Sequence, residues 1–496
     1  MSKSPWRAII PLPMRAFDLG VIAVYLLFIT WFGAQFKQSQ KTLKDYFLGG
    51  RNAPWWAIAF SIVSAETSTL TVIGTPALSF TGNFTFLQLI FGYLLGRIVI
   101  AVLFLPHYFR GEMYTAYELM QRRFGSRVRK FTAGTFLVLR ALAEGVRVFA
   151  VSIVVSIVLG TGELVSIAVI VALTLFYTFE GGMTAVIWTD VVQMFLYVAG
   201  ALVSFFLILQ LIPGGWPEVI AMGQTAHKFQ LLDFRFSLTA AFFQRTYSFW
   251  AGLLGGCFLT TASHGTEQLL VQRLLSARNE RESRFALFSS WAVIFFQFTL
   301  FLLIGVLLFV YERHAPHTAS LLPERIYPEF IWTRLPIGLA GLVIAAILAA
   351  AMSNLSAALN ALASTSIIDF FRPLRPQYSE KQYLRFARWA TVLWGAILFG
   401  VGFAARHWGR VLEAGLSIAS VLYGALLGVF LLGVLTKRPG EWSAILGMSA
   451  GFIATFALRT RVAYTWYVLI GSAATFLVGY GAGLLLQEQR DVRVPA

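Results

Sequence analysis

The chain has 496 residues, of which 58% are hydrophobic and only 12% are charged, and its mean hydropathy is +0.72. Soluble proteins carry about 25% charged residues, so this composition excludes an ordinary water-soluble enzyme and indicates a multi-pass membrane protein. The net charge of +16 does not indicate a nucleic-acid-binding protein, because no long basic stretch stands apart from the hydrophobic segments.

Thirteen apolar runs follow one another along the chain, most of them close to the roughly 20 residues that a helix needs to cross a bilayer. They predict an all-α integral membrane protein with about 13 transmembrane helices. The predicted helices cover residues 17–36, 54–80, 82–108, 131–160, 163–179, 184–212, 242–272, 285–311, 336–368, 389–405, 411–435, 441–458 and 463–486.

The basic residues are distributed unequally between the two sides of these runs. Lys and Arg are roughly twice as frequent on one side as on the other, and cytoplasmic loops are the basic ones. This asymmetry predicts an N-terminus outside and a C-terminus in the cytoplasm. We expect a multi-pass protein of a plasma membrane, which in a bacterium is the inner membrane, with no nucleic acid and no obligatory protein partner.

A dense polar cluster interrupts the second apolar run. Six of the eight residues in Ser64–Thr71 carry a hydroxyl or a carboxylate, and Gly74 and Pro76 follow. These residues predict a helix that is broken in mid-membrane, where free backbone carbonyls can coordinate a cation. The alternative is a contact between helices that is rich in Ser and Thr.

A second polar cluster, Thr260–Gln268, follows Gly255 and Gly256 in the seventh run. It predicts a second broken helix, five spans after the first. Broken helices at matching places in two halves indicate an inverted repeat with a substrate site between the halves.

Two further sets of polar residues lie in apolar surroundings. Ser353 and Ser356 share a helix face and Asn354 adds an amide oxygen, so this stretch is either a site for a hard cation or a seam where helices pack. Asp190 is either a first-turn acid that the helix dipole stabilises or a buried ion ligand.

Taken in order, these motifs resemble the sodium:solute symporter family, which includes sugar, proline, pantothenate, iodide and sialic-acid cotransporters. The resemblance extends from about Asp45 to Lys437. The motifs that carry it are Asp45–Arg51, Ser61–Pro76, Thr115–Glu118, Arg123-Phe124, Gly181-Gly182, Trp188–Asp190, Gln268, Val271–Arg273 and Ala345–Ser356.

The resemblance implies a leucine-transporter-type fold, in which a five-plus-five inverted repeat has discontinuous first and sixth core helices. The sequence then divides into an N-terminal helix and cytoplasmic loop (1–53), a first repeat of five helices (54–212), an extracytoplasmic loop (213–241), a second repeat of five helices (242–435), and two accessory helices with a short tail (436–496).

The resemblance also implies sodium as the coupling ion, with no organic cofactor. Asn354 stands where many members have Ser or Thr, which keeps an oxygen ligand but alters the site. The implied ligands are the backbone carbonyls of Ser64, Thr67 and Ala350 and the side chains of Ser353 and Asn354.

Some members bind a second sodium, and the residues here that match such a site are Asp190 and Ser356, with Glu66 as a further acid. Ala357 replaces the other serine of the pair, which disfavours a second sodium. An ionised Glu66 at mid-depth needs either Na⁺ or Arg97 as a partner.

The implied substrate pocket draws on both breaks and on neighbouring helices, with Tyr423 as a possible gate. Arg140, Glu144 and Arg147 are spaced as an internal ion-pair stripe, which we favour over an arginine that binds a substrate carboxylate. The candidate substrate-binding residues are Ser68, Thr71, Phe86, Gln88, His264, Glu267, Gln268 and Tyr423.

The sequence therefore predicts a secondary active transporter that couples Na⁺ to a small polar organic solute: a sugar, sialic acid, amino acid or monocarboxylate. The alternative in the same architecture is proton-coupled or uncoupled transport through Glu66. A membrane enzyme is disfavoured, because the chain has no metal-spaced His/Cys/Asp cluster and no nucleophile elbow. A sensor is disfavoured because the tail at 487–496 is too short for a signalling domain.

Overall fold

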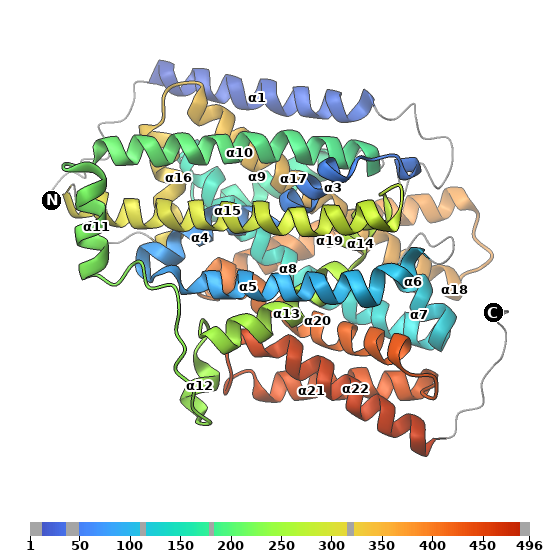
Figure 1. The fold of residues 1–496 in the computed structure, drawn as a ribbon. Helices are drawn as coiled ribbons and strands as arrows, with labels where there is room; N and C mark the ends of the chain where they lie inside the picture. Colours follow the sequence, from blue (N-terminus) through green and yellow to red (C-terminus); the bar gives the residue numbers. More distant parts are fainter. Residues whose placement is uncertain (1–11, 36–48, 110–115, 178–182, 315–321, 487–496) are drawn as a thin grey trace.

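A computed structural model describes residues 12–35, 49–109, 116–177, 183–314 and 322–486. Within these ranges the regular elements are helices, and the only β-type pairing is an isolated bridge between Ala53 and Ala277. Most long helices run alongside one another in a single bundle (Figure 1).

The first part of the chain supplies helices on both sides of the first polar cluster. They are α1 (Leu12–Gln35), α3 (Trp55–Glu66), α4 (Thr69–Thr81), α5 (Leu87–Val99), α6 (Leu105–Phe109), α7 (Ala116–Phe124), α8 (Ser126–Leu159), α9 (Glu163–Tyr177) and α10 (Met183–Leu211).

The second part of the chain supplies the remaining helices. They are α11 (Gly215–Thr225), α12 (Ala240–Gln244), α13 (Phe249–Gly265), α14 (Gln268–Leu275), α15 (Glu280–His314), α16 (Pro323–Arg334), α17 (Leu339–Thr365), α18 (Arg372–Leu374), α19 (Glu380–Ala405), α20 (Val411–Leu435), α21 (Glu441–Leu458) and α22 (Tyr467–Leu485).

Each of the thirteen predicted runs overlaps at least one of these helices. Among the described residues, nine helices are long and apolar enough to cross a membrane, and α3 with α4 makes ten if the bent pair is one span. The all-helical membrane architecture is thereby confirmed, whereas the number of 13 spans stays a prediction.

The structure differs from the predicted runs at several helices, and α7 and α11 also lie outside every run. The seventh run starts with the separate short helix α12, so α13 begins only at Phe249. A helix that the sequence did not predict, α16, lies between α15 and α17. The third run is, as predicted, one continuous helical stretch, which passes from α5 to α6 through a π-helical turn at Ile100–Phe104.

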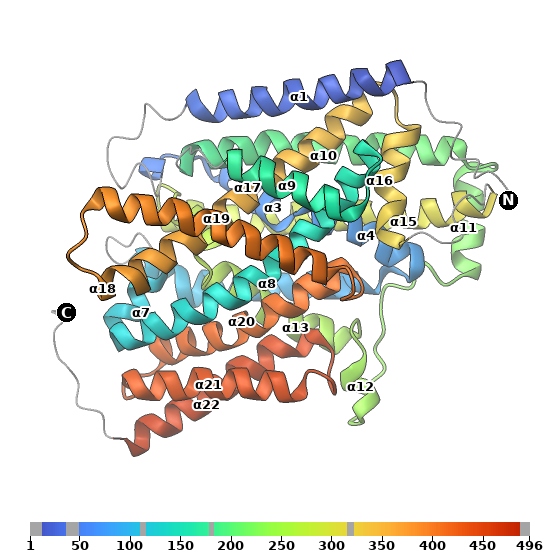
Figure 2. The same cartoon turned by 180° about the vertical axis from the view of Figure 1, so that it is seen from behind.

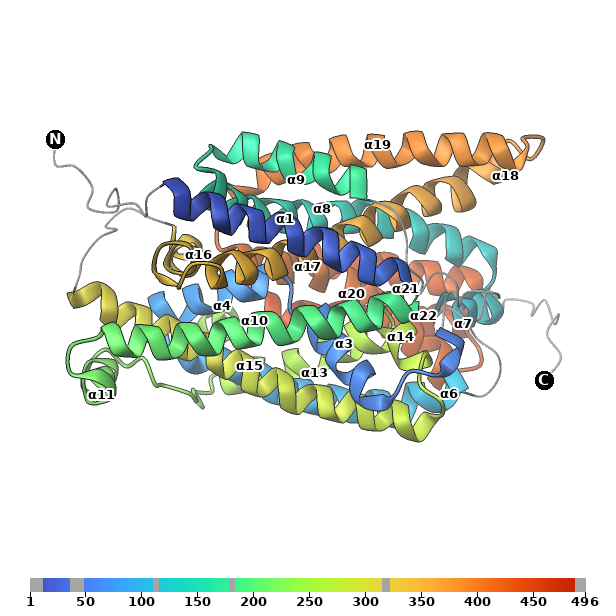
Figure 3. The ribbon, with the colours of Figure 1, turned by 90° about the horizontal axis from the view of Figure 1, so that it is seen from above.

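The broken helices lie inside the bundle and accessory helices lie at its edges. α1 runs along one edge, and α21 and α22 run along the opposite edge (Figure 1). From behind, α8, α9 and α19 lie together on the other face (Figure 2). From above, α1 passes close to α10 and α17 (Figure 3), and α3 and α4 pack against α15.

Both predicted helix breaks are present. α3 ends at Glu66 and α4 begins at Thr69, with a bend of 65° between the two helices. α13 ends at Gly265 and α14 begins at Gln268, and Glu267 has an extended backbone. Ser and Thr side chains compete with the backbone for hydrogen bonds, which favours interruption at such clusters.

Two glycines set the second broken helix directly against α5. A Cβ on Gly92 would lie 2.4 Å from the Gly252 carbonyl oxygen, and one on Gly256 would lie 2.2 Å from the Leu89 carbonyl oxygen. Small residues spaced four apart let membrane helices approach backbone to backbone. This contact brings the charged residue of α5, Arg97, next to both breaks.

Candidate functional site

The first break frees two backbone carbonyls in the middle of the bundle. The Ser68 amide donates to the Glu66 carbonyl, and the Thr71 amide donates to the Ser68 carbonyl. A continuous α-helix would direct those two amides to the carbonyls of Ser64 and Thr67. The break therefore releases the two carbonyls that the family resemblance implies as sodium ligands.

Glu66 connects the first break to the second. One carboxylate oxygen lies 2.9 Å from Nη2 of Arg97, and the other lies 3.0 Å from Nε2 of His264. The Arg97 side chain is fully buried, and its Nε donates to the Leu287 carbonyl at 3.1 Å. Of the two partners that the sequence offered for an ionised Glu66, the structure supplies Arg97.

Glu267 is the acid at the second break, and it belongs to a chain of charges. It lies 2.8 Å from Arg140 and accepts a hydrogen bond from the Tyr423 hydroxyl. Arg140 also lies 3.0 Å from Glu144, which in turn lies 2.6 Å from Arg147. The predicted ion-pair stripe on α8 is therefore present, and it extends to the broken helix.

Asp190 of α10 has a protein cation as its partner. Nη2 of Arg273 in α14 lies 2.9 Å from the Asp190 carboxylate, and the Ser61 hydroxyl of α3 donates to the same carboxylate at 2.6 Å. Ser356, the other residue of the possible second cation site, is buried on α17. The structure thus uses Asp190 to link α3, α10 and α14.

The remaining predicted sodium ligands lie on α17. Ala350 is buried, and Ser353 and Asn354 are half-buried on an unbroken part of that helix. α17 packs against α4 and α10, which places it beside the first break.

Asp18 of α1 fixes the start of α17, because its carboxylate accepts the Gly338 amide at 2.8 Å.

Several predicted substrate residues surround the two breaks. Ser68 lies in the first break and Gln268 begins α14 after the second. Thr71 lies in the first turn of α4, where its hydroxyl donates to the Glu66 carbonyl at 3.3 Å.

Two other candidates lie at the start of α5, where they hold the long loop before α13. Phe86 packs on Tyr247, with ring centroids 5.4 Å apart. The Gln88 amide nitrogen donates to the Tyr247 carbonyl at 2.8 Å, and the Gln88 side-chain oxygen accepts the Asp233 amide at 2.9 Å. Their assignment to substrate stays a prediction.

Sequence reasoning missed a residue of α15 that holds the first break. Gln297 is fully buried, and its side-chain nitrogen donates to the Thr67 hydroxyl at 2.6 Å. A single amide within a long apolar helix was the only sequence signal. Arg273 was noted as part of a motif but received no role.

Comparison with known proteins agrees with this geometry. The family model for the sodium:solute symporter family matches residues 46–451. The chain belongs to the sodium:solute symporter family. This family match confirms the expected transporter and the exclusion of an enzyme.

Curated relatives of this symporter transport different solutes. The sodium/sialic acid symporter SiaT of Proteus mirabilis is 29% identical over 94% of this chain and 95% of its own length. The sodium-coupled monocarboxylate transporter 1 of Xenopus laevis is 28% identical over 88% of this chain and 70% of its own. The human sodium/iodide cotransporter is 26% identical over 88% of this chain and 68% of its own length.

Solved structures support the same conclusion. A Na⁺-coupled sialic acid symporter in a substrate-bound outward-open state superposes with a TM-score of 0.80 at 28% identity, covering 95% of this chain and 98% of its own. The nucleobase-cation-symport-1 family transporter Mhp1 superposes with a TM-score of 0.55 at 12% identity, covering 88% of this chain and 94% of its own. This similarity shows a shared fold. The symporter thus has the expected leucine-transporter-type fold.

Proposed function

We propose that this symporter couples Na⁺ to the uptake of a small polar organic solute by alternating access. The freed Ser64 and Thr67 carbonyls at the α3/α4 break are the observation that carries the proposal. Na⁺ bound there bridges the broken helix to α17. The ion then favours the substrate-competent state by its differential affinity for the two conformations.

The proposed sodium site combines groups from both sides of this gap. Na⁺ is a hard cation that takes neutral oxygen ligands, which backbone carbonyls, hydroxyls and amides provide. The ligands are the carbonyls of Ser64, Thr67 and Ala350 and the side chains of Ser353 and Asn354.

In the finer architecture we propose 13 spans with residues 54–212 and 242–435 as inverted repeats. The N-terminus is outside and the C-terminus is cytoplasmic, in the bacterial inner membrane. The solute binds between the two breaks, at Ser68, Thr71, His264, Glu267 and Gln268, with Phe86, Gln88 and Tyr423 at the outer boundary. The sialic acid and monocarboxylate substrates of the relatives make carboxylate-bearing solutes the first to test.

Proton coupling through Glu66 is the alternative. Glu66 already pairs with Arg97 at 2.9 Å, and protonating it would strand a fully buried guanidinium. This pairing favours Na⁺ over H⁺ as the coupling ion. Similarly, the Arg273–Asp190 pair disfavours a second sodium at Asp190, Ser356 and Glu66.

The test is uptake into proteoliposomes of the purified wild type and of Ser353→Ala. A thermal-shift screen of sugars, sialic acids, amino acids and monocarboxylates, with and without Na⁺, first identifies a solute. We expect Ser353→Ala to raise the half-saturating Na⁺ concentration. An unchanged sodium dependence rejects the sodium site, and uptake driven by a pH gradient without Na⁺ selects proton coupling.

A further inference from the structure

α10 presents a row of polar side chains to the interior of the bundle. Asp190, Gln193 and Tyr197 are spaced by three and four residues, so they share one face of the helix. All three are buried. Asp190 is paired, and the side-chain hydroxyls of Ser64 and Thr67 lie within hydrogen-bond reach of the Tyr197 hydroxyl, whereas Oε1 of Gln193 has no hydrogen-bond partner among the residues that the structure describes.

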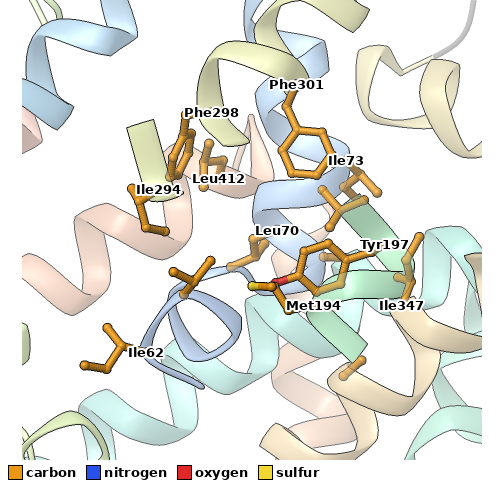
Figure 4. Packing of buried hydrophobic residues seen from close by; sticks show 14 of the residues in the cluster. Ile62, Leu70, Ile73, Met194, Tyr197, Ile294, Phe298, Phe301, Ile347 and Leu412 are labelled. Carbon is orange, nitrogen blue, oxygen red and sulfur yellow. The ribbon is translucent and has the colours of Figure 1, made fainter. Parts of the chain in front are cut away.

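This face of α10 lies along α3 at the first break. Ser61 of α3 donates to Asp190, and further along the same direction the Tyr197 hydroxyl lies beside the side chains of Ser64 and Thr67. Figure 4 draws Tyr197 in the same buried cluster as Leu70, which lies just after the break. Gln193 is three residues after Asp190, just as Ser64 is three residues after Ser61, so the Ser61–Asp190 contact sets the two residues at corresponding positions of the two helices.

The same stretch of α10 also lies along α17. A Cβ on Gly200 would lie 2.4 Å from the Val343 side chain, and Figure 4 draws Ile347 next to Tyr197. Gly200 of α10 contacts Val343 of α17, and Tyr197, one turn earlier on α10, lies beside Ile347, one turn later on α17. The two helices therefore run in opposite directions here. In this register Gln193, seven residues before Gly200, corresponds to Ala350, seven residues after Val343.

Gln193 and Tyr197 thus lie between the two groups of proposed sodium ligands, those of α3 and those of α17. A buried polar atom without a partner costs free energy, and native proteins supply a protein group, a water or an ion. Amide and hydroxyl oxygens are neutral hard ligands of the same kind as the freed carbonyls.

We propose that Oε1 of Gln193 and the hydroxyl of Tyr197 are additional oxygen ligands of the coupling sodium. This inference rests on the proposed function, which it extends to a third helix. Sodium then connects α3, α10 and α17. Gln297 acts as a positioning residue, because its bond to the Thr67 hydroxyl fixes the peptide whose carbonyl faces the ion.

The test measures binding of sodium alone, because the solute is unidentified. Purified full-length protein is titrated with radioactive ²²Na⁺, with choline chloride maintaining the ionic strength. We expect Tyr197→Phe and Gln193→Leu each to raise the half-saturating Na⁺ concentration about tenfold, as the loss of one ligand implies. Thermal unfolding in choline alone reports on folding separately.

Two controls separate ligation from structural damage. Tyr327→Phe also removes a buried hydroxyl that bonds to α10, at Ser204. It should leave sodium binding unchanged. Gln193→Glu keeps an oxygen at the position and should bind sodium at least as tightly as the wild type.

The outcomes distinguish this inference from the proposed function. If Tyr197→Phe and Gln193→Leu bind sodium like the wild type while Ser353→Ala binds it more weakly, the α10 ligands are wrong and the α3/α17 site stands. If Ser353→Ala is also unaffected, the proposed site itself is wrong. Two results for the control variants would also contradict the ligand role. One is sodium binding by Gln193→Glu that is as weak as that of Gln193→Leu. The other is sodium binding by Tyr327→Phe that is as weak as that of Gln193→Leu.

Discussion

The imidazole of His264 lies 3.0 Å from the carboxylate of Glu66, so the last turn of one broken helix contacts the last turn of the other. Arg97 of α5 holds the second oxygen of the same carboxylate. A movement of α3 against α13 must therefore break or carry along a buried ion pair, which couples the two breaks mechanically.

Replacing Glu66 alone should lower the free energy of unfolding more than replacing both Glu66 and Arg97. Glu66→Gln leaves Arg97 buried without its counter-charge, and we expect a loss of about 3–5 kcal/mol in the free energy of unfolding. The double variant Glu66→Leu/Arg97→Met should recover most of that loss, since an apolar replacement strands no charge. Thermal unfolding in detergent measures both, and a double variant less stable than the single one would contradict this account.

Removing the cation beside Asp190 should create a sodium requirement. Arg273→Gln leaves a buried carboxylate unpaired, which a sodium ion can then neutralise. We expect a lower unfolding temperature than that of the wild type in choline chloride and a recovery as NaCl replaces choline, by mass action. The control Asp190→Asn/Arg273→Gln has no charge to neutralise, and equal recovery in that variant would show a non-specific salt effect.

The backbone contact between α5 and α13 should not tolerate a larger side chain. A Cβ on Gly256 would lie 2.2 Å from the Leu89 carbonyl, whereas a Cβ on Gly400 of α19 would meet no atom within 4 Å. Gly256→Val should therefore abolish the monodisperse peak in size-exclusion chromatography, while Gly400→Val should leave it unchanged. Normal folding of Gly256→Val would show that the two helices can separate at small cost.

The loop before α13 contains a lysine whose charge depends on pH. Nζ of Lys228 donates to the carbonyls of Ser79, Phe80 and Gly82 at the end of α4, at 3.2, 2.6 and 3.0 Å. Burial lowers the pKa of Lys228 to about 8, and the neighbouring Arg313 acts in the same direction.

Between pH 8 and the unfolded-state pKa of 10.5, the unfolded chain binds more protons at Lys228 than the folded protein does. The stability of the wild type should therefore rise relative to that of Lys228→Met as the pH increases through this window. The measurement is the difference in unfolding temperature between the two proteins at pH 7 and pH 9. A difference that moves against the wild type at the higher pH would contradict the lowered pKa.

The sequence predicted the positions of most long helices and of both breaks because those features depend on neighbouring residues. A bilayer requires each apolar run to satisfy its own backbone, and the clusters at Ser64–Thr71 and Thr260–Gln268 supply competing polar groups locally. The ion-pair stripe on α8 was equally readable, since its residues lie within two turns of one helix.

Only the tertiary structure decided which polar groups meet across the bundle. Glu267 pairs with Arg140, Asp190 with Arg273 and Gln297 with Thr67, and the partners lie between 83 and 230 residues apart in sequence. A single polar residue in an apolar helix carries the same local pattern whether it faces a seam, a counter-charge or an ion. Its partner is fixed by how close the helix backbones come, as at Gly256 and Gly200, and that distance depends on residues from several segments at once.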